Sequence, residues 1–185
     1  MKKLLFVNAC VRSEHSRTLH IAERYIDTLK AKDDIEVTEK NLCRESLSFI
    51  TDSDFDPESG ELRSGQNAAL AREFAEADEI VIAAPFWEFM FPAIFSCYLE
   101  AVSIPGIVFE YTPEGSRGLC RAESLTYIYS AGNVLSDRDK LCEEYMKRMS
   151  ELYGIENFVA VYADGLDIET NSPEDIVREV CMKLK

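Results

Sequence analysis

The most constraining feature of the sequence is an unbroken apolar run, residues 80–84, that ends at a proline and a cluster of aromatic residues. The run is rich in β-branched residues and too short for a helix, so it predicts a strand buried on both faces of a parallel sheet. Pro85 ends this strand because proline has no N–H to donate, and Pro92 suits the first turn of a helix. The mostly aromatic loop between them follows the carboxyl end of a central strand, where open α/β sheets bind their ligands. The loop therefore predicts a site for a flat ring system.

The remaining chain predicts strands that alternate with helices, which indicates one doubly wound α/β sheet. Strands are expected at residues 3–9, 35–42, 80–84, 125–129 and 158–163, and helices at residues 16–29, 65–77, 92–103, 137–153 and 173–184. The second strand alternates in polarity like an edge strand, whereas the first, third and fourth look buried. This pattern favours five parallel strands in the order 2-1-3-4-5 with helices on both faces. Residues 1–185 are expected to form a single domain.

Charge and hydropathy narrow the possible partners. The chain has 20 Lys and Arg against 34 Asp and Glu, for a net charge of −14. Nucleic acid is not expected as a partner, because a phosphate backbone requires a basic surface. No apolar run approaches the length of a membrane span, and the N-terminal apolar run fits a first strand better than a signal peptide. A cytoplasmic protein without membrane association is expected.

Cysteine and acidic residues do not predict a disulfide framework or a metal site. The six cysteines are scattered without a Cys-x-x-Cys pair, and His15 and His20 lack zinc-site spacing to them. The acidic connection at residues 43–64 invites a calcium interpretation. However, Pro57 and Arg63 stand where an EF-hand loop requires Gly and Glu. A solvated surface loop is the better interpretation.

The loop after the first strand predicts an anion site. Ser16 is a suitable N-cap for the following helix, whose N-terminus offers unpaired N–H groups. The hydroxyls of Ser16 and Thr18 and the guanidinium groups of Arg12 and Arg17 are suited to completing a phosphate cradle. No G-x-G-x-x-G or Walker motif is present, which argues against dinucleotide and triphosphatase folds. The alternative is ordinary N-capping beside surface arginines.

Two further strand ends are expected to meet this loop. The aromatic loop, with Glu88 among its rings, either supports a flavin or covers the core or a dimer contact. A carboxylate among aromatic rings is costly unless it is paired or hydrogen-bonded. The third loop is small and polar, and its glycine lets the backbone approach a ligand closely. Its alternative role is a tight turn before a helix. This loop comprises Ser130, Ala131, Gly132 and Asn133.

The sequence gives little support for Ser-His or Cys-His nucleophilic catalysis, because both histidines lie within residues 15–20. Cys10, at a helix N-terminus near arginines, is a candidate for a lowered thiol pKa, but a role as a small space-filling residue is favoured. The helix at residues 92–103 is apolar nearly all round. Such a helix is expected to be buried against something beyond its own sheet, most simply a second subunit.

The motifs Ala84-Pro85-Phe86-Trp87-Glu88-Phe89, residues 106–115 and Gly118-Leu119 resemble the FMN-dependent NADH azoreductase and NAD(P)H quinone reductase family. The resemblance covers residues 2–165 and implies a flavodoxin-like fold and a homodimer with one FMN per subunit, at sites formed across the interface. It implies that the loop of Cys10, Ser16, Arg17 and Thr18 holds the phosphate, with Cys10 where the family has serine, and Arg12 lies in the same loop. The isoalloxazine would rest on Pro85, Phe86, Trp87, Glu88 and Phe89, near Ser130, Ala131, Gly132 and Asn133. Tyr111 matches an aromatic residue that reaches into the partner's active site.

The resemblance implies an FMN-dependent NAD(P)H oxidoreductase. NADH or NADPH would donate a hydride, and a quinone, azo or similar flat acceptor would take the electrons in a ping-pong cycle. No side-chain nucleophile and no metal is expected, because the cofactor carries the chemistry. Two alternatives stay open: a flavodoxin-like one-electron carrier, whose acidity would suit docking on basic partners, and a non-catalytic flavin-binding protein.

Overall fold

The computed structural model describes residues 1–47, 49–59, 65 and 67–184 of the chain. The sheet strands are β1 (Lys2–Asn8), β2 (Ile35–Asn41), β3 (Glu79–Ala83), β6 (Ser124–Ser130) and β7 (Asn157–Ala163), and a hairpin is formed by β4 (Phe109–Thr112) and β5 (Gly115–Gly118). The helices are α1 (Arg17–Lys30), α2 (Asn67–Glu76), α3 (Ala93–Val102), α4 (Leu141–Tyr153) and α5 (Pro173–Lys183). None of the helices within the described ranges has the length and apolar character needed to cross a membrane.

Five strands form one parallel sheet in the order β2-β1-β3-β6-β7. The expected order 2-1-3-4-5 counted only five strands. Residues 109–118 were expected only as an excursion with turns, but they form the antiparallel β4–β5 hairpin. This hairpin comes between β3 and β6 along the chain, so the fourth and fifth strands of the sheet are numbered β6 and β7. The apolar run of β3 lies at the centre of the sheet, with Ile80 in register between Leu5 and Leu125. The central strand and its aromatic loop therefore occupy the expected position.

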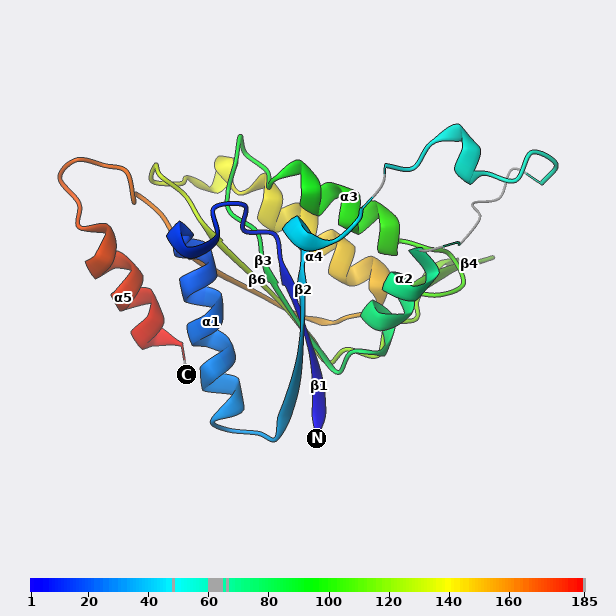
Figure 1. Ribbon diagram of the computed structural model, residues 1–185, viewed down its shortest axis with the longest axis horizontal. Coiled ribbons are helices and arrows are strands. Elements are labelled where there is room, and N and C mark those ends of the chain that lie inside the picture. Colours follow the sequence, from blue (N-terminus) through cyan, green and yellow to red (C-terminus); the bar gives the residue numbers. More distant parts are fainter. Residues whose placement is uncertain (48, 60–64, 66, 185) are drawn as a thin grey trace.

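Alternate residues along the strands enter two separate hydrophobic clusters. On β1, Leu5 and Val7 belong to one cluster and Leu4 and Phe6 to the other. Figure 1 shows α1 and α5 on one side of the sheet and α2, α3 and α4 on the other. The first cluster is rich in aromatic residues from α2, α3 and α4, whereas the second is mainly aliphatic.

Several predicted boundaries are corrected by local structure. The helix expected at residues 137–153 begins as a 3-10 turn, Asp137–Asp139, capped by Ser136, and α4 starts only at Leu141. Helix α2 starts at Asn67 rather than Gly65, and residue 66 lies outside the described residues. In the acidic connection, residues 48 and 60–64 also lie outside them, and the described part contains the 3-10 turns Leu42–Arg44 and Asp52–Asp54.

The apolar character of α3 is explained largely within this chain. Phe95, Tyr98 and Val102 are fully buried, and the Tyr98 ring lies 6.4 Å from that of Phe74 on α2. The prediction that α3 is buried beyond its own sheet is met by α2, which covers it. This burial therefore gives no separate indication of a second subunit.

Candidate functional site

The first wall of the candidate site is the start of α1. Ser16 is its N-cap, and its hydroxyl accepts a hydrogen bond from the Leu19 N–H at 3.2 Å. The N–H groups of Arg17 and Thr18 have no acceptor among the described groups. Two unpaired N–H groups at the positive end of a helix dipole favour an anion at this position.

The second wall is the aromatic loop, which forms a two-residue turn. Trp87 and Met90 exchange backbone hydrogen bonds of 2.9 Å, and Glu88 and Phe89 between them have φ values of 51° and 69°. Left-handed backbone at two consecutive non-glycine residues costs on the order of 1–3 kcal/mol each. Trp87, at the start of this turn, is 44% exposed.

The third wall follows β6 and joins the other two. The Ser130 hydroxyl lies 2.7 Å from that of the fully buried Thr18, and the Ser130 carbonyl accepts from the Phe86 N–H at 3.1 Å. A Cβ added at Gly132 would lie 2.4 Å from a carboxylate oxygen of Asp167. The absence of a side chain at residue 132 therefore lets the loop after β7 approach the loop after β6.

These walls enclose a cleft of about 230 Å³ at the carboxyl ends of the strands. Ten of its lining residues are among those predicted from the sequence. They are Arg12, Ser16, Arg17, Thr18, Pro85, Phe86, Trp87, Ser130, Ala131 and Gly132. The sequence analysis missed His15, Leu166 and Asp167, which also line the cleft. The last two follow the carboxyl end of the fifth sheet strand, and that position alone was a signal for them.

Five predicted residues do not line this cleft. The Cys10 side chain is buried beneath the loop, with its sulfur 3.6 Å from the Ala83 carbonyl, and burial raises the pKa of its thiol to about 11. The candidate lowered thiol pKa is therefore wrong for Cys10, and its burial fits the favoured role of a small space-filling residue. Glu88 and Phe89 are exposed at the turn, so the carboxylate of Glu88 avoids the burial cost expected from its aromatic neighbours. Asn133 is exposed, and Tyr111 is 77% exposed on the β4–β5 hairpin.

The charges at the cleft are of both signs. The Arg17 guanidinium donates to the Asp167 carboxylate at 2.8 Å, and both side chains are partly exposed. An exposed pair of this kind contributes only about 0–1 kcal/mol, so Arg17 is available to a second anion at little cost. Arg12 and His15 also line the cleft. The arrangement suits a ligand with an anionic end at α1 and a flat apolar body against Phe86 and Trp87.

The fold and this cleft define a flavodoxin-like protein. The model of the flavodoxin-like fold family matches residues 2–183, and the chain belongs to that family. An FMN-dependent NADH:quinone oxidoreductase from Clostridium acetobutylicum is 33% identical over 100% of this chain and 97% of its own length. The family membership predicted from the aromatic-loop and hairpin motifs is thereby confirmed.

Two solved structures from Bacillus anthracis share the fold. An azoreductase superimposes with a TM-score of 0.84 at 23% identity, covering 100% of this chain and 97% of its own. An FMN-dependent NADH-azoreductase in complex with FMN has a TM-score of 0.82 at 20% identity, covering 100% of this chain and 96% of its own.

Proposed function

We propose that this chain is an FMN-dependent NADH:quinone oxidoreductase that reduces quinone, azo or similar flat acceptors in a ping-pong cycle. The observation that carries the proposal is the joining of three loops at one cleft. Thr18 and Phe86 both hydrogen-bond Ser130, so the anion site and the aromatic wall are held in fixed relation. The Clostridium acetobutylicum relative, which matches this whole chain, is named for the same activity.

The residues present fit FMN. The phosphate would lie at the N-terminus of α1, where the free N–H groups of Arg17 and Thr18 and the guanidinium groups of Arg12 and Arg17 favour negative charge. The isoalloxazine would lie on Phe86 and Trp87, with the backbone of Ala131 and Gly132 at its polar edge. Cys10 would support the loop from below without touching the phosphate.

Bound FMN would supply the redox chemistry, accepting a hydride from NADH or NADPH and passing electrons to the acceptor. The side chains of this chain act by position. Trp87 and Phe86 provide an apolar surface that excludes water, and the backbone of Gly132 lines the same cleft. Arg17 balances the phosphate charge and exchanges part of its contact with Asp167. No side chain is required as a nucleophile.

We also propose that the active form is a cytoplasmic homodimer in which each subunit is a single domain, residues 1–185, with helices on both faces of its sheet. The cleft of about 230 Å³ is below the usual 300–1,000 Å³ range of small-molecule pockets, so it encloses only part of such a ligand. Phe89 and Tyr111 are 54% and 77% exposed. A second subunit would cover such side chains, and the partner's copy of the Tyr111 side chain would then form a wall of the substrate pocket.

FMN binding with altered Arg17 tests the proposal. Arg17→Ala removes a charged donor, and hydrogen bonds to charged groups contribute about 1.5–3 kcal/mol, so the Kd for FMN should rise at least about tenfold. Quenching of flavin fluorescence measures the Kd. Arg138→Ala is the matched control, because Arg138 is an exposed arginine outside the cleft. An unchanged Kd in Arg17→Ala would reject the assignment of the phosphate to α1.

Activity is tested separately by following anaerobic NADH oxidation with a quinone acceptor. Steady turnover with parallel double-reciprocal plots is expected. A protein that binds FMN but oxidises neither nicotinamide would reject the oxidoreductase assignment and favour the electron-carrier or non-catalytic alternative.

A further inference from the structure

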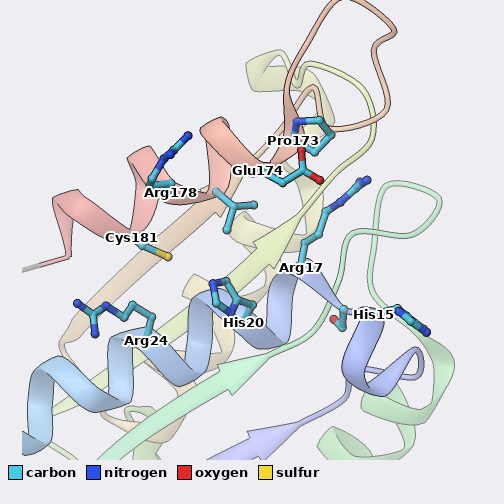
Figure 2. A pocket seen from close by; sticks show the side chains of 10 residues that line it. His15, Arg17, His20, Arg24, Pro173, Glu174, Arg178 and Cys181 are labelled. Atoms are coloured by element: carbon cyan, nitrogen blue, oxygen red, sulfur yellow. The ribbon is translucent and has the colours of Figure 1, made fainter.

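A second and larger cavity lies between α1 and α5, on the face of the sheet opposite α3 (Figure 1). Its volume is about 660 Å³, within the usual range for small-molecule sites. Figure 2 shows Arg17 reaching from α1 toward Pro173 and Glu174 at the start of α5, with His20 of α1 below them. We call this cavity the α1/α5 groove.

The groove combines an apolar floor with cationic walls. Val177, only 7% exposed, and Pro173 supply the apolar part. Three arginines and one carboxylate, that of Glu174, line it. Asp167 and Asp175 pair with two of these arginines, so Arg24 is the one left without an ion-pair partner among the described residues, in a chain with 34 acidic and 20 basic residues. The groove is therefore a local site for an anion on an otherwise acidic molecule.

The three arginines differ in how far they are already paired. Arg17 pairs with Asp167 and Arg178 with Asp175, both as partly exposed pairs. Arg24 has no ion-pair partner within the described part of the chain. Burial raises the pKa of the Cys181 thiol in the groove, and the nearby Arg24 opposes that rise. The field of Arg24 thus acts within the groove.

The combination selects one class of ligand. A bare phosphate would use the arginines but leave the Val177 and Pro173 surface without a partner. An alkyl chain would use the apolar surface but leave the Arg24 guanidinium without a partner. A nucleoside phosphate uses both parts, because guanidinium groups bind phosphate and also stack on planar bases.

We propose that the α1/α5 groove is a second ligand site that binds a nucleoside phosphate, with the base against Pro173 and Val177 and the phosphate held by Arg24. The groove shares His15, Ser16 and Arg17 with the flavin cleft, so the two ligands would be neighbours. Two sources have this chemistry: a free nucleotide, and the adenosine phosphate half of a nicotinamide dinucleotide. The second source rests on the proposed function, and the first does not.

Calorimetric titration of the full-length protein with adenosine 5′-monophosphate, in the presence of FMN, tests the site directly. Wild-type protein should bind this nucleotide, and adenosine without phosphate should bind at least about tenfold more weakly. Arg24→Glu should raise the Kd for the nucleotide at least about tenfold, and Arg178→Glu should raise it less, because Asp175 already pairs with Arg178. Arg72→Glu on α2 is the control for the charge change and should leave the Kd unchanged.

The outcomes show whether the groove binds a nucleoside phosphate and, if so, whether that ligand is a free nucleotide or part of a dinucleotide. If adenosine 5′-monophosphate competes with NADH and Arg24→Glu raises the KM for NADH, the groove receives the dinucleotide. If binding occurs without such competition, the groove receives a free nucleotide. No binding at millimolar concentration, or equal Kd values for wild type and Arg24→Glu, would overturn the proposal. Because calorimetry does not depend on turnover, an inactive protein that still binds the nucleotide would overturn only the proposed oxidoreductase function.

Discussion

The two faces of the sheet are packed with different types of side chain. On the face covered by α2, α3 and α4, aromatic rings interlock: Phe74 meets Tyr153 edge-on at 5.2 Å, and Tyr127 stacks on Tyr129 at 4.9 Å. On the face covered by α1 and α5, the cluster is mainly aliphatic, and α5 contributes only Val177 as a buried residue. Large rings fill the first face, whereas the α1/α5 groove stays open on the second.

This difference indicates where stability and binding reside. Buried rings contribute large apolar areas and specific edge contacts, so they hold the helices of the aromatic face firmly to the sheet. The loosely covered face can provide space for a ligand because little packing is lost there.

The largest expected effect comes from removing one ring. Phe74→Ala should lower the free energy of unfolding by about 3–5 kcal/mol, because a fully buried ring is lost and a cavity is left. Val177→Ala at the edge of the groove should cost only about 1–2 kcal/mol. Urea unfolding measures both values. Equal costs would mean that the two faces are equally well packed.

Thiol reactivity is expected to differ by at least about tenfold between the faces. Burial raises the pKa of Cys120, next to the aromatic cluster, to about 12. At pH 8 only about one such thiol in ten thousand is ionised, and its alkylation should accelerate as pH rises toward that pKa. Cys181 lines the groove, where Arg24 opposes the rise in pKa caused by burial. Peptide-resolved alkylation with iodoacetamide should therefore modify Cys181 before Cys120.

Cys43 is exposed and serves as the fast reference in that experiment. If Cys120 reacted as quickly as Cys181, the aromatic face would have to open in solution, and the contrast in packing would fail.

The smallest effect concerns two hydroxyls within the aromatic face. The Tyr98 hydroxyl is buried without a hydrogen-bond partner among the described residues, whereas the Tyr153 hydroxyl lies 2.7 Å from that of Ser103. Tyr98→Phe should therefore stabilise the protein by about 1 kcal/mol, and Tyr153→Phe should destabilise it by a similar amount. Thermal and urea unfolding of both variants measure the difference. A destabilised Tyr98→Phe would show that its hydroxyl is paired in solution.

Much of the fold followed from local patterns. The apolar run of β3, the N-cap at Ser16 and the two prolines around the aromatic loop each act over a few residues, so the sequence alone predicted them. The β4–β5 strands escaped prediction because each has only four residues, and β5, with two glycines, a serine and an arginine, has no hydrophobic periodicity.

The sequence predicted which loops form the candidate site, but it predicted less well which side chains line the cleft and which contacts they make. The hydrogen bond between Thr18 and Ser130 joins residues 112 positions apart, and no local pattern encodes it. Glu88 was expected among rings, yet the turn directs it to solvent because its backbone is left-handed. Asp167 enters the cleft only because Gly132 allows two loops to approach.

The sequence by itself determined which segments become strands and which strand ends carry aromatic, basic and small residues, because those preferences are set by neighbours along the chain. The tertiary structure decided which of those residues share a cleft and left a basic groove between two helices that are far apart in sequence. Both outcomes depend on how parallel strands stack and how completely each face is filled, which are properties of packing in three dimensions.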